Sequence, residues 1–415
     1  MRTTASLQHC PVVESFDPLS PEFIADPYAI MAALGLDEAP IFFAPSIGYY
    51  VITRHADMAE VFRDPATYSA AEATVPMVPL VAEAQQILHA GGFKPAMVSL
   101  DEPEHGRLRK PTARAFSLRR VTALVPVIEA TATRLLDGVA GATEFDLVSV
   151  LAFPLPANIV FSLMGVPERD YAQLKEWCGY RAALGFGRPA PEDQVDIATR
   201  MAAYRGYMRD LVHVKVGEPS DDLTSDLIAI HEQAPERLTL EEISSILFSL
   251  SFAGHETTTG LIGNTVRRLL EDPTRWAEVV AQPDLIPAAV EESLRYDPSV
   301  PVWRRITTRP VTLSGVDLPK GARLFLWLAA SGRDPAAFAE PDRFDLRRPD
   351  AEGHLAFGKG LHFCLGASLG RLEAQIAIAE LARRYPHLRL APDQELTFHP
   401  NISFRGPQVL KVGTQ

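Results

Sequence analysis

Cysteine is scarce in this 415-residue chain, which has only three: Cys10, Cys178 and Cys364. So few and so widely spaced cysteines exclude a disulfide framework and favour a reducing compartment. The chain also lacks any apolar run near the roughly 20 residues that a membrane-spanning helix needs, and its first residues lack the apolar core of a secretory signal. We therefore expect a soluble, cytoplasmic protein with no role in a membrane.

The sequence also lacks an excess of basic residues and any evident boundary between domains. The net charge is −12, and without a basic stripe the surface is not suited to binding nucleic acid. No glycine- and serine-rich linker, charge run or internal repeat divides the sequence. Although the length alone suggests two or three domains, we expect a single domain over residues 1–415.

Helical periodicity dominates what is present, chiefly between residues 105 and 272. Thr239 and Glu242 have the form of a capping box, and the apolar helix that begins there is expected to continue to Leu270 across the core. Shorter strand-like stretches cover residues 48–54, 304–314, 322–331 and 396–406. The sequence therefore predicts a mainly α fold with a minor β portion and a long central helix.

One cysteine lies in an unusual setting, the stretch FGKGLHFCLG from Phe357 to Gly366. Cys364 comes just before a helical pattern, and a helix N-terminus lowers the pKa of a nearby thiol. The glycines allow a tight turn and the close approach of a bulky group. For an arbitrary cysteine a structural role would be the better interpretation, but the pattern F-G-x-G-x-H-x-C-x-G is too specific for that.

This pattern resembles the haem-binding loop of the cytochrome P-450 family, whose axial iron ligand is a cysteine thiolate. The resemblance implies haem b with Cys364 as its axial ligand. It also implies that Phe357 packs beside the sulfur and that His362 reaches a haem propionate. Gly366 would let the start of the following helix lie close to the flat macrocycle.

A second unusual stretch is FAGHETTTG, residues 252–260, inside the predicted central helix. Glycine, three threonines and a glutamate make a poor buried helix interior, and polar residues at a simple kink would be the alternative. The zinc-protease pattern H-E-x-x-H fails, because its last position is threonine here. The stretch is similar to the family's distal motif, with Ala253 and Gly254 opening a groove for dioxygen. Glu256 and Thr257 would relay protons there.

A third stretch, EESLRYDP, places Glu292 and Arg295 three residues apart on one helix face. By itself this spacing is typical of a solvated ion pair. Its distance from the cysteine and the later segment EPDRFD match the family arrangement, in which Arg343 would complete a structural triad with these two residues. That triad would hold the cysteine loop.

Haem also needs cations for its two propionates. His105 and Arg109 lie four residues apart on one predicted helix face, as in the family. Arg305 matches the family position before a strand, although its neighbour Arg304 is the alternative. Taken singly, each is expected at the surface, but with His362 they form a consistent set.

The resemblance implies a monooxygenase that inserts one oxygen atom from O2 into a small hydrophobic or aromatic substrate, by hydroxylation or O-dealkylation. The expected substrate pocket includes Phe252, Val300, Val302 and Ile402. No evident cationic anchor for a substrate carboxylate stands out, although Arg181 and Arg188 are candidates.

Electrons would come from a redox partner, either a ferredoxin or a fused flavin and iron–sulfur reductase. The segment NISFRGPQVLKV near the end resembles the haem domain of self-sufficient, reductase-fused enzymes. Lys110, Lys359 and Arg371 are expected to form a cationic patch that binds the partner. Two alternatives remain: a peroxide-driven peroxygenase and a non-enzymatic haem-thiolate sensor. Neither would need the pair Glu256 and Thr257 as a relay.

Overall fold

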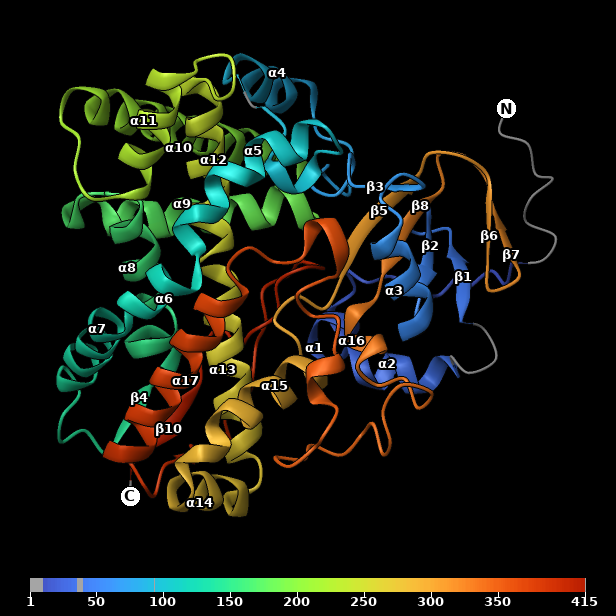
Figure 1. Cartoon of the computed structure of the whole chain (residues 1–415). Coiled ribbons are helices and arrows are strands. Elements are labelled where there is room, and N and C mark those ends of the chain that lie inside the picture. Colours follow the sequence, from blue (N-terminus) through green and yellow to red (C-terminus); the bar gives the residue numbers. More distant parts are fainter. Residues whose placement is uncertain (1–9, 36–39, 93, 415) are drawn as a thin grey trace.

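Helices make up most of the molecule; the five-stranded sheet and the β6–β7 hairpin lie on one side of it, and β4 and β10 lie on the other (Figure 1). The computed structural model describes residues 10–35, 40–92 and 94–414. Within these ranges no helix is both long and apolar enough to cross a membrane. The predicted class, mainly α with a minor β portion, is confirmed.

The α-helices succeed one another with short connections for most of the chain. In chain order they are α1 (Pro21–Ala25), α2 (Pro27–Leu34), α3 (His55–Arg63), α4 (Ala82–Ala90), α5 (Glu104–Ala113), α6 (Leu118–Ala123), α7 (Val125–Asp137), α8 (Pro154–Leu163), α9 (Tyr171–Phe186), α10 (Pro191–Gly217), α11 (Leu223–Gln233), α12 (Leu240–Ala253), α13 (Glu256–Leu270), α14 (Pro273–Ala281), α15 (Ile286–Tyr296), α16 (Leu328–Ser331) and α17 (Ala367–Arg384).

The largest sheet has five strands in the order β1-β2-β8-β5-β3, with only β2 and β8 parallel. A second sheet has the order β4-β10-β9, and β6 and β7 form a hairpin. The strands are β1 (Ile41–Ala44), β2 (Tyr49–Ile52), β3 (Tyr68–Ser69), β4 (Glu144–Asp146), β5 (Trp303–Thr307), β6 (Val311–Leu313), β7 (Val316–Leu318), β8 (Arg323–Leu326), β9 (Arg389–Leu390) and β10 (Lys411–Gly413).

The central helix begins as predicted and is interrupted where its sequence is weakest. The Thr239 hydroxyl accepts a hydrogen bond from the Glu242 amide, and the Glu242 carboxylate accepts one from the Thr239 amide. The prediction of one helix to Leu270 is wrong, because α12 ends at Ala253 and α13 begins at Glu256. A Cβ on Gly254 would lie 2.8 Å from the Val160 side chain, so α8 packs directly against the break.

The strand predicted over residues 396–406 is also wrong. Only isolated bridges occur there, between Gly187 and Asn401 and between Phe398 and Pro407. Prolines at 400 and 407 remove backbone donors from any longer ladder. Residues 322–331 are divided between β8 and α16.

Two apolar clusters form the core. One surrounds the five-stranded sheet together with α9, α10 and α12 and includes Phe325 and Trp327. The other lies among α7, α13, α15 and α17 and includes Val266 and Ile378. Helices α13 and α17 lie side by side in the middle of the molecule (Figure 1). The first residues of both helices, and the segments just before them, border the site described next.

Candidate active site

A deep cavity lies between the break in the central helix and the loop that precedes α17. Ala253, Gly254 and Thr257 line it from the helix break, and Phe357 and Cys364 line it from the loop. Two motifs more than 100 residues apart in the sequence therefore meet across one cavity.

The cysteine loop is shaped by two glycines in the left-handed region. Gly358 has φ of 67° and Gly360 has φ of 69°. A Cβ on Gly360 would lie 2.6 Å from the carbonyl oxygen of Phe62, so only glycine lets this turn pack against α3. The Cys364 amide then donates a 2.9 Å hydrogen bond to the Phe357 carbonyl. The turn leaves the thiol exposed to the cavity, just before α17.

The Cys364 thiol does not have the lowered pKa that the sequence predicted. Burial raises its pKa, and the Gly366 amide, Arg109 and Arg371 oppose that effect without overcoming it. The exposed surface of the thiol faces the cavity rather than bulk water, which explains why burial dominates. In the protein chain alone the thiol is therefore stabilised in its neutral form. A coordinated cation would reverse that preference.

Two histidines and two arginines border the same cavity: His105, Arg109, Arg305 and His362. The imidazole rings of His105 and His362 lie 4.2 Å apart, between centroids. Both ring nitrogens of His105 and the Nε2 of His362 lack a hydrogen-bond partner among the described residues. Burial and the charges of Arg305, His105 and Arg109 lower the pKa of His362 to about 3. At pH 7 the positive charge of the cluster is therefore carried by its two arginines, while His362 is neutral.

The choice between the two neighbouring arginines of β5 follows from strand alternation. Arg305 lines the cavity, and burial lowers its pKa to about 10. Arg304 is directed elsewhere: it donates hydrogen bonds to the carbonyls of Val75 at 2.7 Å and Gly185 at 3.3 Å. Of the two, Arg305 is the one placed with the other cavity-facing cations.

At the helix break, Thr257 and Glu256 face different surroundings. Thr257 lines the cavity, and its hydroxyl donates a 2.8 Å hydrogen bond to the Ala253 carbonyl. The Glu256 side chain is 14% exposed and lies 3.8 Å from the Nε2 of His255. Burial raises the pKa of Glu256 to about 7 and lowers that of His255 to about 3. The ring is therefore neutral at pH 7, and this contact is not an ion pair.

A buried charge network lies behind the cysteine loop, but its third member differs from the prediction. Glu292 and Arg295 form two hydrogen bonds of 2.7 Å and are fully buried. Arg348, not Arg343, reaches Glu292, with its Nε 3.1 Å from the carboxylate. The Arg343 side chain is 61% exposed and pairs with Glu340. Arg343 contributes only its backbone carbonyl, which accepts a hydrogen bond from Arg295.

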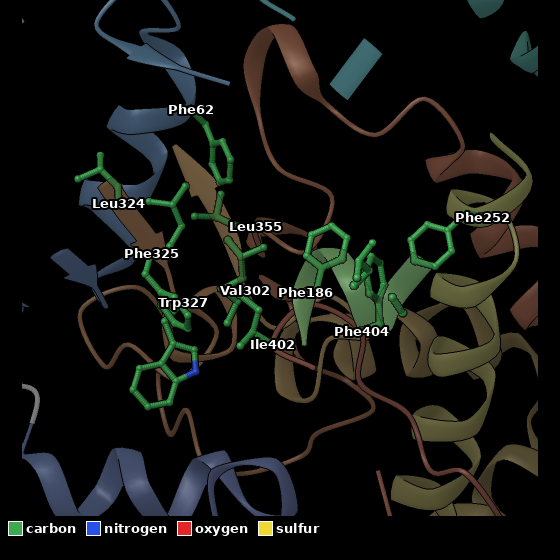
Figure 2. Packing of buried hydrophobic residues seen from close by; sticks show 14 of the residues in the cluster. Phe62, Phe186, Phe252, Val302, Leu324, Phe325, Trp327, Leu355, Ile402 and Phe404 are labelled. Carbon is green, nitrogen blue, oxygen red and sulfur yellow. The ribbon is translucent and has the colours of Figure 1, made fainter. Parts of the chain in front are cut away.

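The predicted substrate-pocket residues divide into two pairs. Phe252 and Val300 line the cavity. Val302 and Ile402 are buried in the core instead and are not among the cavity-lining residues; Figure 2 shows them between Trp327 and the rings of Phe186 and Phe404. That part of the prediction is wrong, because both side chains are packed inside the apolar core.

Known proteins match this chain over most of its length. A family model described as Cytochrome P450 matches residues 278–406. Cytochrome P450 107B1 of Saccharopolyspora erythraea is 38% identical over 371 residues, which is 88% of this chain and 88% of the relative. This chain belongs to the cytochrome P450 family.

Solved P450 structures share its fold. Full-length CYP116B46 from Tepidiphilus thermophilus superposes with a TM-score of 0.93 at 34% identity. The match covers 97% of this chain and 53% of that one, so this chain spans about half of that protein. Cytochrome P450 CREJ superposes with a TM-score of 0.92 at 35% identity, covering 97% of this chain and 100% of its own.

Membership of the family identifies this P450 as a monooxygenase, which is an oxidoreductase. P450s hold haem b with a cysteine thiolate as the axial ligand. The cavity fits that group on two counts. It exposes the Cys364 sulfur, and it borders four basic side chains, a set that suits two propionates. The two imidazoles among them have ring nitrogens without a hydrogen-bond partner among the described residues.

Two cavity or network residues were missed from the sequence. Glu373 on α17 lines the cavity, is 1% exposed, and has no hydrogen-bond partner among the described residues for either carboxylate oxygen. Burial raises its pKa well above the usual range. The sequence did contain a signal for Glu373: it lies four residues from both Leu369 and Ala377, and so on the apolar face of the helix. Arg348 gave no comparable signal, because it lies in an irregular loop.

Proposed function

We propose that this P450 inserts one oxygen atom from O2 into a small hydrophobic or aromatic substrate, by hydroxylation or O-dealkylation, with Cys364 as the axial ligand. The observation that carries the proposal is the cavity itself, which has Cys364 on one side and the helix break at Gly254 on the other. The bound haem would supply the activation of dioxygen with two electrons and two protons, leaving water as the second product.

The residues of the cysteine side would hold that group in place. Cys364 would bind the iron, with the Gly366 amide directed at its sulfur and Phe357 beside the loop. His105, Arg109, Arg305 and His362 would bind the two propionates. Gly366 would leave room for the macrocycle, because nothing lies within 4 Å of the position that its Cβ would take.

Glu256 and Thr257 would deliver protons from the other side. A carboxyl group exchanges protons most readily when its pKa lies near the working pH, and burial raises the pKa of Glu256 to about 7. The Thr257 hydroxyl holds its proton against the Ala253 carbonyl, and rotation about χ1 would turn it into the cavity. Ala253 and Gly254 supply the gap in the helix that such a rotation needs.

Electrons would enter from the side of Cys364, from a ferredoxin or a fused flavin and iron–sulfur reductase. Lys110 and Lys359 are exposed there and are the two free cations of the proposed docking patch. Arg371 contributes less than expected, because its guanidinium is paired with Glu291 at 2.5 Å. The three free cysteines support a cytoplasmic location.

The apolar part of the cavity supports an aromatic substrate. Phe252 packs edge-on against Phe404, with centroids 4.8 Å apart, and Phe404 packs edge-on against Phe186 at 5.0 Å. Figure 2 shows these three rings grouped together beside α12. We call Phe186, Phe252 and Phe404 the aromatic wall. CREJ, similar in structure, was solved in complex with an aromatic compound, (4-ethylphenyl) dihydrogen phosphate.

The reduced, carbon monoxide-treated protein tests this proposal. We expect the long-wavelength Soret band of a thiolate-ligated haem in the wild type and in Cys10→Ser, and its loss in Cys364→Ser. Persistence of the band in Cys364→Ser would contradict the assigned ligand. Product formed with hydrogen peroxide alone, at the yield of a reductase system, would support a peroxygenase instead. Haem binding without product from either system would support a sensor.

A further inference from the structure

Arg181 places a positive charge in the part of the cavity that is lined by α9 and α12. It lies on α9, five residues before the aromatic-wall residue Phe186, and it lines the cavity together with Ser249 and Leu250 of α12. Its guanidinium stacks on two rings, 4.5 Å from the centroid of Phe248 and 5.0 Å from that of Phe252.

The charge of Arg181 has no acidic partner. Its Nη1 donates a 2.6 Å hydrogen bond to the Phe248 carbonyl, and among the described residues no carboxylate forms an ion pair with it or shifts its pKa. Other arginines nearby are paired: Arg205 with Glu241 at 2.5 Å and Arg188 with Asp17 at 2.8 Å. Removing a guanidinium from water without a counter-charge is costly, and burial lowers the pKa of Arg181 accordingly.

The surroundings define what would compensate that charge. The aromatic wall lies next to Arg181, and Trp303 lies near it, 6.1 Å from Phe186 between ring centroids. One carbonyl contact leaves most of the five guanidinium N–H donors free. A planar guanidinium binds a carboxylate or a phosphate through two parallel hydrogen bonds. The site therefore combines an apolar slot with one anion-binding group at its end.

We propose that the substrate of this P450 is an amphipathic acid, with an aromatic or apolar body and one terminal carboxylate or phosphate monoester that Arg181 binds. This inference rests on the proposed function and narrows its substrate class. The Phe248 carbonyl that orients Arg181 is five residues before Ala253, about 7.5 Å along α12. The anion and the carbon that is oxidised would therefore lie at opposite ends of one small molecule.

Binding of three matched probes to the haem-loaded enzyme tests this inference by calorimetry: 4-propylbenzoate, 4-propylphenyl phosphate and the neutral 4-propylbenzamide. In the wild type we expect the better anion to bind at least about tenfold more tightly than the amide, because charge-assisted hydrogen bonds are the stronger ones. The anion that binds more tightly identifies the group as carboxylate or phosphate.

Arg181→Gln should raise the Kd of the better anion about 10- to 100-fold and change the Kd of the amide less than about threefold. Arg181→Lys should fall between the two, because it keeps the charge and loses the bidentate geometry. The matched control is Arg188→Gln, which removes an equal charge at a 44% exposed ion pair and should leave all three affinities unchanged.

Two results would overturn the inference: equal wild-type affinity for the amide and both anions, or an equal loss for all three probes in Arg181→Gln. The second result would mean that Arg181 only joins α9 to α12. The wild-type comparison needs no variant and decides the question even if Arg181→Gln does not fold. A normal carbon monoxide band with no preference for an anion would reject this inference alone, whereas loss of that band in the wild type would reject the proposed function.

Discussion

The two walls of the cavity treat buried charge in opposite ways. Behind the cysteine wall, which comprises residues 354–371 and the helix α15 that supports it, the buried carboxylates of α15 are paired. Glu291 contacts Arg371 and His354, and Glu292 contacts Arg295 and Arg348. These pairs connect α15 to the loop and to α17, so they fix the position of the cysteine.

The helix-break wall, formed by α9, α12 and the start of α13, leaves its buried titratable groups without counter-charges. Burial alone raises the pKa of Glu256, both ring nitrogens of His255 lack partners among the described residues, and Arg181 bonds only to a carbonyl. The difference separates two uses of a buried charge. Paired groups maintain shape, whereas unpaired groups remain available to protons and ligands.

Removing a partner from the cysteine wall should have the largest effect. Glu292→Ala would leave Arg295 and Arg348 buried without their carboxylate, and we expect it to lower the free energy of unfolding by roughly 3–5 kcal/mol. Arg348→Ala removes one charged contact and should cost about 1.5–3 kcal/mol. Denaturant titration followed by the Soret band measures both.

Arg343→Ala is the matched control for that network. Its side chain is 61% exposed and its contribution to the network is a backbone carbonyl, so we expect a change below about 1 kcal/mol. If Arg343→Ala lowered the free energy of unfolding as much as Arg348→Ala, the third member of the network would be Arg343, as the sequence predicted, and not Arg348.

The confusion between these two arginines shows where sequence reasoning ends. Cys364, Phe357 and His362 lie in one contiguous motif, and the resemblance of that motif to the family's haem-binding loop implied that they share one site. Arg343 and Arg348 lie in an irregular loop, where no periodicity states which side chain turns inward. The direction of the Arg348 side chain is set by its contact with Glu292 of α15, 56 residues away in the sequence, and only the fold supplies that contact.

The second prediction concerns the pH dependence of stability and compares one glutamate from each wall, Glu256 and Glu291. An unfolded glutamate has a pKa of about 4.3, and in the folded protein burial raises that of Glu256 to about 7. Between these values the native state keeps a proton that the unfolded state releases, so stability falls as pH rises through this window. Glutamine at position 256 does not titrate, so Glu256→Gln lacks that fall. The free energy of unfolding of the variant relative to the wild type should therefore rise by roughly 3 kcal/mol from pH 5 to pH 8.

Glu291 on the cysteine wall should behave with the opposite sign. Burial is outweighed by the hydrogen bonds from Arg371 and His354, which lower the pKa of Glu291 to about 2. Its ionised form therefore stabilises the fold above pH 4 and loses that effect only as pH falls toward 2. Glu291→Gln should be destabilising by a similar amount at every pH from 5 to 8. If the free energy of unfolding relative to the wild type changed with pH in the same way for both variants, the two walls would not differ in their effect on a buried glutamate.

The sequence composition predicted a weak point in the central helix but not the residue at which the helix is interrupted. Glycine and three threonines in FAGHETTTG mark a weak helix, yet nothing local says that α12 stops at Ala253. Nor does the local sequence show that Val160 of α8 approaches position 254 too closely for a side chain, so that the fold requires glycine there. Val302 and Ile402 were expected in the pocket because of the family resemblance, which does not tell a core position from a cavity wall.

The smallest expected effect concerns one hydroxyl of the helix-break wall. Thr257→Val keeps the volume of Thr257 and removes the group that donates to the Ala253 carbonyl and faces the cavity. We expect the fraction of reductant electrons recovered in product to fall about tenfold, because proton delivery to the reacting oxygen is impaired, while the carbon monoxide band is unchanged. Thr259→Val removes a hydroxyl two residues away that is not among the cavity-lining groups and should leave the coupling intact. Equal coupling in both variants would show that the unpaired groups of this wall do not deliver protons, and that the contrast between the walls concerns stability alone.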